Sequence, residues 1–405
     1  MAQTYKFGNG TWATKKGSTL AYSDTNNAFK PLPFSFERNS IGTRVNKEGL
    51  IEVVGNDIPR IDYTDSTEGA LLLENSATNY SIYSELPSTW TYTEFGSGSA
   101  GTITTGKTDM FGGTNAVQVD FPSDAENVGI LFGSAISGLG SGNCNISIYV
   151  KLVESGSKIL QLRAGFKDIV NVSSTEFTRV DLSGTKSNNE AFNLKLRPSE
   201  GTSVGGFSII VCHPQEENNS VASSYIPTNG STIQRAAETC NDSGNSEVFN
   251  DSEGVLFADI AALANDGGNR ILSINNGTQS ERIIILYTST NNQIRCLGTA
   301  NGATQFDISF ITSDVTLFSK ISFKYKNNNF ALWVNGFEIG TDTNGNIPSG
   351  LSKLSFNSGT TAAPFYGKTK EIAYYDEILT DEELEYMTSY RSLNEMVTEL
   401  NLNAL

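Results

Sequence analysis

Residues 320–340 read KISFKYKNNNFALWVNGFEIG, and this stretch gives the clearest indication of the fold. Apolar Ile321, Phe323 and Tyr325 alternate with polar residues, which is the period of a strand with one buried face. An Asn-Gly pair at residues 335–336 then separates two further apolar runs, and both residue types tolerate the positive φ of a tight hairpin turn. The stretch therefore predicts consecutive antiparallel strands of a β-sandwich.

The residues downstream continue the same module. The triplet LSF occupies residues 354–356, and FYGKTKEIAYYDEILTDEEL occupies residues 365–384. Together with the hairpin, these runs resemble laminin-G-like and concanavalin-A-like domains, which share an Asn-Gly hairpin, a closing strand and a helix after it. The resemblance implies a laminin-G/concanavalin-A-like sandwich over residues 240–380. Because this fold hosts lectins, glycanases and passive spacers, it does not define an activity.

A helix is predicted at the C-terminal end, over residues 381–405. Thr380 and Glu383 have the spacing of a capping box, in which the two side chains satisfy backbone amides of the first turn. Residues at spacings of four and three then form a seam: Tyr386, Tyr390, Leu393, Val397, Leu400 and Ala404. Two interpretations stay open, because the helix could pack on its own sandwich and fray, or join a partner helix or a threefold bundle.

A second region with a two-residue period covers residues 81–239. Ile146, Ile148, Val150 and Leu152 alternate with Asn, Ser, Tyr and Lys, as expected of half-buried antiparallel strands. Gly- and Ser-rich loops separate such runs. The pattern predicts a jelly-roll-like β-sandwich, so the fold class is mostly β with two antiparallel sandwiches.

Short motifs in this region resemble the carbohydrate-binding-module-like domain of bacteriophage display proteins. They are Tyr83-Ser84-Glu85, Trp90, DMFGGTNA at residues 109–116, Ser224-Tyr225-Ile226-Pro227-Thr228 and Arg235-Ala236-Ala237. The resemblance implies that residues 81–239 form a carbohydrate-binding-module-like sandwich.

Residues 1–80 have a different character. The run FSFERNSIGTRVNKEGLIEVVGNDIPRIDYTDSTEGALLLENSATNY at residues 34–80 contains short apolar pairs that are separated by Gly and Pro, which break helices. Such an extended chain needs a neighbour to bury against. We therefore expect residues 1–80 to form an extended attachment or oligomerisation segment that is buried against another subunit.

This N-terminal region resembles a segment of bacteriophage virion proteins. The matching runs are TRVN at residues 43–46, GLIE at 49–52, PRIDY at 59–63, LLLE at 71–74 and TNY at 78–80, preceded by a comparable run from Phe7 to Phe34. The resemblance implies attachment to a virion, and a trimer, which is common for fibres of this family.

Residues 239–254 are rich in Asn, Ser, Gly and acidic residues and contain few apolar side chains. This composition predicts an exposed linker between two sandwiches that fold independently. Limited proteolysis is expected to cut there first.

The composition of the whole chain narrows its class. A length of 405 residues favours several domains, and 38 Gly with 10% aromatic residues favour short strands and tight turns. A net charge of −16 argues against nucleic-acid binding, and no run of about 20 apolar residues predicts membrane insertion. The cysteines are far apart without CxxC spacing, which predicts buried free thiols at Cys144, Cys212, Cys240 and Cys296.

Catalytic patterns are weak in this sequence. A glycanase of the concanavalin-like fold needs two carboxylates that face one groove, and no predicted strand carries both. The acidic clusters at residues 62–68 and 376–383 lie in turn-like or helix-start contexts. The only histidine, His213, ends a strand beside Pro214 and is interpreted as structural. We predict no catalytic residue and no cofactor.

Metal binding is a lesser possibility, because laminin-G-like domains sometimes hold Ca²⁺ through carboxylates and loop carbonyls. The candidates are Asp342 with Asn344 and Asn346, or Asp242 with Asp251. Hydrogen-bonded turns explain this spacing better, so no metal site is predicted.

Trp90 and Tyr92, in the run STWTYTEF, are the candidate ligand-binding residues. On a regular strand they share one face, where two rings could stack on a sugar. The alternative is that Trp90 fills the core, because aromatic residues dominate core burial. Trp333 is also interpreted as a core residue.

These observations and the resemblance together predict a non-enzymatic bacteriophage virion protein, a head or tail fibre or a decoration subunit. Its partners would be other virion proteins, further copies of itself in a trimer and a host surface glycan, with assembly in the host cytoplasm. Two alternatives stay open: a decoration protein without a ligand, and a polysaccharide-degrading enzyme.

Overall fold

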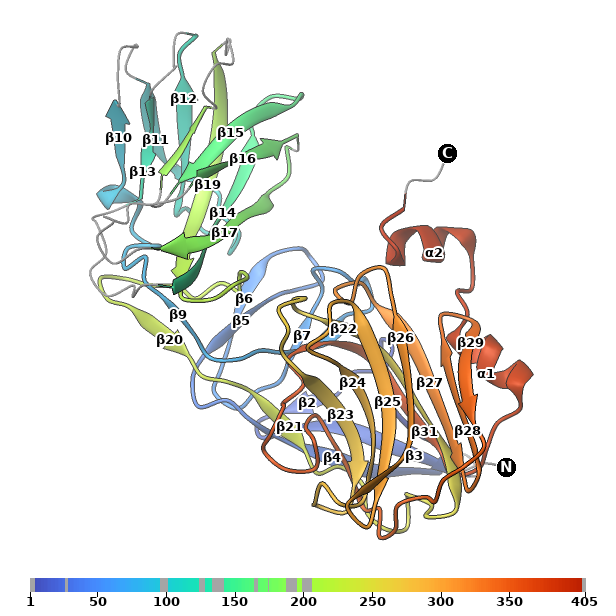
Figure 1. Ribbon diagram of the computed structural model, residues 1–405. Coiled ribbons are helices and arrows are strands. Elements are labelled where there is room, and N and C mark those ends of the chain that lie inside the picture. Colours follow the sequence, from blue (N-terminus) through green and yellow to red (C-terminus); the bar gives the residue numbers. More distant parts are fainter. Residues whose placement is uncertain are drawn as a thin grey trace. The chain divides into compact units, whose positions relative to one another are not determined.

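The computed structural model describes residues 4–25, 28–94, 101–123, 128–132, 142–163, 167–173, 175–186, 195–198 and 206–402. The fold is mostly β and contains two antiparallel β-sandwiches, as the sequence predicts (Figure 1). Each sandwich belongs to one of two compact units that are discontinuous in sequence. Unit 1 contains Met1–Asn39, Val54–Asn75 and Ala237–Leu405, and unit 2 contains Ser40–Val53 and Ser76–Ala236.

Unit 1 is built from a large and a small sheet. In spatial order, the main path of the large sheet is β21 (Thr239–Asn241), β4 (Ala28–Glu37), β3 (Ser18–Thr25), β1 (Thr4–Gly8), β31 (Gly367–Tyr375), β22 (Glu253–Ala262), β27 (Ser319–Lys326), β28 (Asn329–Val334) and β29 (Phe337–Asp342). Off this path, β2 (Thr14–Lys15) pairs with β3, and β8 (Ala70–Leu73) pairs with β31 and with β7 (Arg60–Asp62). The small sheet has the order β26 (Ala303–Ile311), β25 (Gln293–Ala300), β24 (Arg282–Tyr287), β23 (Arg270–Asn275) and β30 (Lys353–Ser355).

The N-terminal strands belong to this sandwich instead of forming a separate extended segment. β1 pairs directly with β31 near the other end of the chain, and Figure 1 shows the blue N-terminal strands within the same unit as the red β31. Tyr5, Phe7, Phe34 and Leu71 are buried in the core that both sheets of unit 1 share. The expectation that residues 1–80 lack a core of their own chain is therefore wrong, because these apolar residues are buried intramolecularly. The boundaries expected near residues 80 and 240 do not coincide with those of the units.

Unit 2 contains the sandwich predicted from residues 81–239. One sheet has the order β10 (Thr91–Glu94), β13 (Val128–Leu131), β18 (Lys195–Pro198), β15 (Lys158–Arg163) and β16 (Lys167–Val172). The other has the order β11 (Thr102–Lys107), β12 (Ala116–Phe121), β19 (Phe207–Glu217), β14 (Gly142–Leu152) and β17 (Thr178–Lys186). Two short strand pairs lie outside these sheets: β5 (Gly42–Val45) pairs with β6 (Ile51–Val54), and β9 (Ala77–Asn79) pairs with β20 (Ile233–Arg235). A short 3-10 turn, η1, covers Pro87–Thr89.

The apolar residues predicted to face the cores are buried there, as Ile146, Ile148, Val150 and Leu152 of β14 show in unit 2. The strand is not half-buried as expected, because the residues between them, Asn145, Ser147 and Tyr149, are buried as well. In unit 1 the turn between β28 and β29 has positive φ at Asn335 and Gly336, 50° and 88°. Glycine and asparagine adopt this conformation at little cost, so the Asn-Gly pair specifies the hairpin.

The C-terminal region contains two short helices instead of the single helix predicted over residues 381–405. α1 (Asp381–Thr388) begins with the predicted capping box, and α2 (Leu393–Glu399) follows a break. Ser389 and Ser392 have extended backbones at the end of α1 and the start of α2, which interrupts the predicted seam. Ala404 lies outside the described residues.

Residues 239–254 do not form an exposed linker. β21 pairs with β4, and Cys240, Val248 and Phe249 are buried in the core of unit 1. Three apolar anchors are enough to hold this stretch, although its overall composition is polar. The expectation of preferred cleavage there is therefore withdrawn.

The four cysteines are free and buried, as predicted. In the part of the chain that the structure describes, no helix is both long and apolar enough to span a membrane.

Candidate functional site

The candidate platform residues have different positions. Trp90 is only 5% exposed, packs edge-on against Phe132 with ring centroids 5.1 Å apart, and donates a hydrogen bond from Nε1 to the Tyr83 carbonyl at 3.0 Å. Its ring is therefore part of the unit 2 core. The backbone of Tyr92 lies in β10 opposite Ile130, but its side chain is outside the described residues. Ligand binding by this pair stays a prediction that depends on Tyr92.

Two other residues singled out in the sequence are also buried. Trp333 packs with Leu384 of α1. His213 is 1% exposed, its Nδ1 lies 2.8 Å from Glu85 Oε1, and its ring packs against those of Phe111 and Tyr225. These contacts fit the structural interpretation of both residues.

The candidate Ca²⁺ ligands serve in local structure. Asp342 Oδ1 accepts a hydrogen bond from the Asn344 amide at 2.9 Å, which is an Asx turn, and Asp251 accepts hydrogen bonds from the amides of Gly350 and Leu351 at 2.6 and 2.9 Å. Among the described residues, no group of three or more His, Cys, Asp or Glu side chains is placed to hold a metal ion.

Arg60 and Glu74, two residues of the motifs that resemble phage virion proteins, lie in a buried ion cluster of unit 1 together with Arg38 and Glu238. Glu238 lies 2.7 Å from Arg38 Nη1 and accepts a 2.9 Å hydrogen bond from Arg60 Nε, and Glu74 lies 2.8 Å from Arg60 Nη2. Burial alone would lower the pKa of Arg60, but the charges of Glu238 and Glu74 outweigh it and raise the pKa. The cluster joins three separate stretches of the chain, so the motif residues have a structural role.

Motif residues of unit 2 form a second buried network. Ser84 Oγ accepts a hydrogen bond from the Tyr225 hydroxyl at 2.6 Å and one from the Thr228 amide at 3.0 Å. Asn79 donates to the Ile226 carbonyl at 2.8 Å. The exit motif therefore bonds to residues 79–84, near the start of the longer segment of unit 2.

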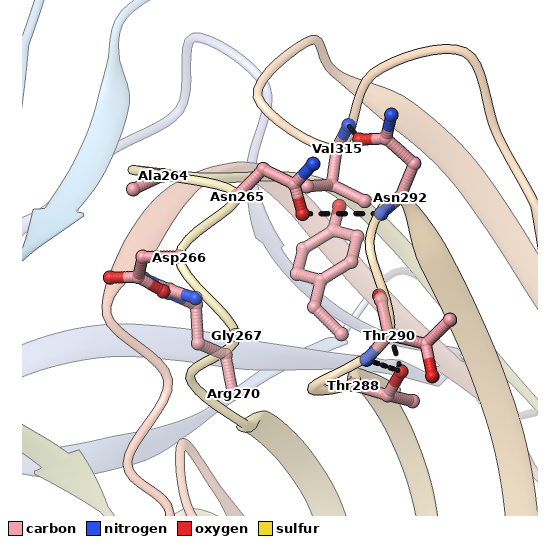
Figure 2. A pocket seen from close by; sticks show the side chains of 10 residues that line it. Ala264, Asn265, Asp266, Gly267, Arg270, Thr288, Thr290, Asn292 and Val315 are labelled. Carbon is pink, nitrogen blue, oxygen red and sulfur yellow. Dashed lines mark hydrogen bonds and ion pairs between the residues drawn. The ribbon is translucent and has the colours of Figure 1, made fainter.

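A small depression in unit 1, among the described residues, is lined mainly by polar side chains of loops. It lies between the loop that joins β22 to β23 and the turn that joins β24 to β25 (Figure 2). It is shallow: the empty space of about 170 Å³ includes open solvent, and no enclosed space for a water molecule remains. Its lining residues are Ala264, Asn265, Asp266, Gly267, Arg270, Tyr287, Thr288, Thr290, Asn292 and Val315. We call this site the loop pocket.

Hydrogen bonds fix the walls of the loop pocket. Figure 2 shows Asn265 linked to Asn292: the Asn265 side-chain oxygen accepts from the Asn292 amide at 3.2 Å. Thr288 Oγ1 accepts from the Thr290 amide at 3.0 Å. Arg270, whose side chain is 10% exposed, donates to Asp266 Oδ1 at 2.9 Å. The pocket is therefore preorganised by loop hydrogen bonds.

The electrostatics of the loop pocket depend on Asp266. Burial opposes its ionisation, but the hydrogen bond from the Gly268 amide and the charge of Arg270 outweigh burial and lower its pKa. Asp266 is thus an ionised hydrogen-bond acceptor at neutral pH. The ten lining residues include no second carboxylate, no histidine and no cysteine, so the pocket can bind hydroxyl groups but lacks an acid–base pair.

Sequence reasoning missed the loop pocket. Its residues come from the ends of several strands. Asn292 and Gly267, with φ of 57° and 76°, carry local turn signals, but these do not show that the two turns meet. It also missed Asp259 and Glu371, which lie directly opposite each other on β22 and β31. No local pattern could pair residues from such distant strands.

Comparisons with known proteins give weak likenesses. No protein-family model matches the chain, and no curated protein matches it. The carbohydrate-binding module CBM40 of the Ruminococcus gnavus IT-sialidase bound to α2,3-sialyllactose is 18% identical, with a TM-score of 0.31, and covers 37% of this chain and 94% of its own. Domain 4 of a Geobacillus stearothermophilus arabinanase in complex with arabinotriose is 11% identical, with a TM-score of 0.32, over 42% of this chain and 84% of its own.

A third structure, Trypanosoma rangeli sialidase in complex with the inhibitor DANA, is 9% identical, with a TM-score of 0.29, and covers 95% of this chain and 70% of its own. Because all three TM-scores lie far below 0.5, no argument about function rests on these likenesses.

Proposed function

We propose that this protein is a non-enzymatic glycan-binding display protein, and that the loop pocket of unit 1 contacts the glycan. The observation that supports the proposal is the chemistry of the pocket rim. Asn265, Asp266 and Thr290 are exposed there and offer an amide, an ionised carboxylate and a hydroxyl group. Groups of this kind hydrogen-bond the hydroxyl groups of a sugar.

The size of the loop pocket restricts the ligand. The pocket is a shallow depression with no enclosed room for a water-sized sphere, unlike the roughly 300–1,000 Å³ of ordinary small-molecule pockets. It would therefore contact only the edge of one terminal sugar residue of a host glycan and would not enclose it. Affinity per site would be low, so repeated copies on a particle would supply the avidity.

We propose further that the protein is a fibre or decoration subunit of a bacteriophage virion, assembled in the host cytoplasm as a homotrimer. This part of the proposal is supported by the sequence resemblance of residues 7–80 and of the exit motif near residue 225. Most of the buried apolar residues in the first 80 positions pack within this chain, in unit 1 or unit 2, which removes one physical reason for the trimer and leaves it to depend on the resemblance. Mass spectrometry of purified particles and sedimentation of the full chain test these two points.

The glycan proposal is tested with the full chain, because fragments cut near residue 240 would separate β1, β3 and β4 from the rest of their sheet. A glycan array identifies the ligand, and calorimetric titration compares Asn265→Ala and Thr290→Ala with the parent chain. We expect each variant to weaken binding about tenfold, the loss of one hydrogen bond of roughly 1.4 kcal/mol. Thermal unfolding should change little, because both residues are exposed.

Asn269→Ala is the matched control, since Asn269 is exposed in the same loop but does not line the pocket. Unchanged binding in both pocket variants would exclude the loop pocket, and an array without any bound glycan would favour a decoration protein without a ligand. Release of reducing ends from host polysaccharide would instead favour a degrading enzyme.

A further inference from the structure

Helix α2 is held on unit 1 mainly by charge. None of the seven described residues of α2 is buried, although helices in proteins usually owe most of their stability to a buried face. Glu395 is ion-paired with Lys320 of β27, and both carboxylate oxygens of Glu399 lie 2.5 Å from Lys370 Nζ of β31. The two glutamates are one helical turn apart, so they contact the sheet from the same face of α2.

Beneath α2, three charged residues lie side by side across adjacent strands. The strand register places Asp259 of β22 directly opposite Glu371 of β31 on one side and Lys320 of β27 on the other. Their side chains point away from the core, because the adjacent residues Ala258 and Ile372 point into it. We call Glu371, Asp259 and Lys320 the charged row.

The charged row contains unsatisfied polar atoms. Asp259 is 7% exposed, and its Oδ1 is buried without a hydrogen-bond partner among the described residues. The hydroxyl of Tyr390, in the connection between α1 and α2, is buried in the same way. The Tyr390 ring lies against Lys320, with Nζ 5.3 Å from the ring centroid. Unsatisfied buried polar groups are costly, so an arrangement in which water reaches them is favoured by their solvation.

We propose that α2, with residues 389–392, is a detachable latch over the charged row, which opens as pH rises from mildly acidic to mildly alkaline values and as salt concentration rises. The closed latch gives two partly buried lysines their carboxylate partners. Opening gives Asp259 and Tyr390 access to water and exposes the row. The proposal goes beyond glycan binding and does not depend on it.

The titration of Asp259 supports the direction of the pH effect. Burial, followed by the charges of Glu399 and Glu371, raises the pKa of Asp259 to about 7, although Lys370 and Lys320 oppose the shift. In the open latch the carboxyl group is solvated and returns toward its ordinary pKa near 4. The closed form therefore favours protonated Asp259 and becomes less stable as pH rises from about 4 to about 7.

The other groups that face the row set the lower limit of the window. Burial opposes ionisation of Glu395, but Lys320 and the Arg391 amide outweigh it and lower the pKa of Glu395. The closed latch needs this carboxylate ionised, so it also weakens as pH falls through that lowered pKa. Burial raises the pKa of Glu371, although Lys6, Lys320 and Arg391 oppose the shift. Ionisation of Glu371, like that of Asp259, therefore destabilises the closed latch as pH rises. The latch is tightest at mildly acidic pH.

Salt acts on the same contacts. The side chains of Lys320 and Lys370 are 14% and 10% exposed, and those of Glu395 and Glu399 are 27% and 18% exposed, so ions reach both pairs. The Debye length falls from roughly 10 Å at 0.1 M to about 3 Å at 1 M salt. Because no residue of α2 is fully buried and Met396 and Val397 are only half-buried, weakening the pairs releases the helix.

Amide hydrogen exchange of α2 in the full chain measures opening. After correction for intrinsic exchange rates, we expect the opened fraction to be at least about tenfold larger near pH 8 than near pH 5.5. Asp259→Asn keeps the shape of the side chain but removes its titration, so its opened fraction should change far less with pH. Glu395→Gln with Glu399→Gln should open the latch at both pH values and abolish its dependence on salt.

Glu385→Gln on α1 is the control, because it removes one carboxylate charge at an exposed position outside the latch. Exchange of β22 and β27 amides shows in the same experiment whether a variant has unfolded. A wild-type pH dependence in Asp259→Asn, or wild-type protection in the double glutamine variant with intact β22 and β27, would overturn the proposal.

Discussion

The buried ion cluster and the charged row belong to the same unit and contain the same kinds of side chain, yet they are arranged differently. In the cluster, Glu238 contacts both Arg38 and Arg60, and Arg38 also donates to the carbonyls of Val54 and Gly55 at 3.2 and 2.6 Å. In the row, Asp259 keeps an oxygen that is buried and has no partner among the described residues.

The difference shows how a protein separates structural charges from responsive ones. A buried charge that is fully paired and hydrogen-bonded stays ionised over a wide pH range and joins distant segments. A buried carboxyl group without partners titrates near neutral pH. The free-energy difference between the closed and open forms around it then depends on pH. The ion cluster and the charged row therefore differ in pH response mainly because their charged groups are paired to different extents, and less because of burial.

The largest effect is expected from Glu238→Ala in the ion cluster. The variant removes the carboxylate that Arg38 and Arg60 share and leaves Arg60 with Glu74 alone, and breaking a buried ion pair in this way costs about 3–5 kcal/mol. Urea denaturation followed by circular dichroism measures the loss for unit 1. A loss below about 1 kcal/mol would show that the cluster contributes little to folding stability. The contrast between a structural ion cluster and a responsive charged row would then be wrong.

An opposite sign is expected from Asp259→Asn in the charged row. The folded pKa of Asp259 is raised to about 7, so its ionisation disfavours the native state increasingly as pH rises from about 4 to about 7. The variant should therefore be more stable than the parent chain near pH 8, on the order of 1–3 kcal/mol, and nearly equal to it near pH 4. Urea denaturation at both pH values measures the difference. Equal stabilities near pH 8 would show that water already satisfies this carboxyl group.

The smallest effect is expected at an exposed pair, Arg295 with Asp307. Their side chains are 38% and 39% exposed, and Arg295 Nε donates to Asp307 at 2.7 Å. Asp307→Asn should cost only about 0.2–1 kcal/mol, because solvent screens the pair. The loss should shrink further when salt is added. If it matched the loss in Glu238→Ala, burial would not be the reason for the strength of the ion cluster.

Local patterns in the sequence were enough to predict much of the fold. The core-facing residues of β14 and β27, the Asn-Gly turn at residue 335 and the capping box at Thr380 appear in the structure as expected, although the opposite faces of both strands are largely buried too. These signals are reliable because a turn, a cap or a half-buried strand is specified by neighbouring residues. The free, buried cysteines follow from spacing and composition in the same way.

Only the tertiary structure decided what depends on register between distant strands. The pairing of β1 with β31 buries Tyr5 and Phe7, which looked unpartnered in sequence, and the register of β22 places Asp259 beside Glu371 and Lys320. The loop pocket likewise gathers the ends of several strands. The local sequence around a residue does not indicate which residue of a distant strand will lie beside it. The sequence by itself therefore determined many of the elements, whereas packing between them determined the candidate site and the proposed latch.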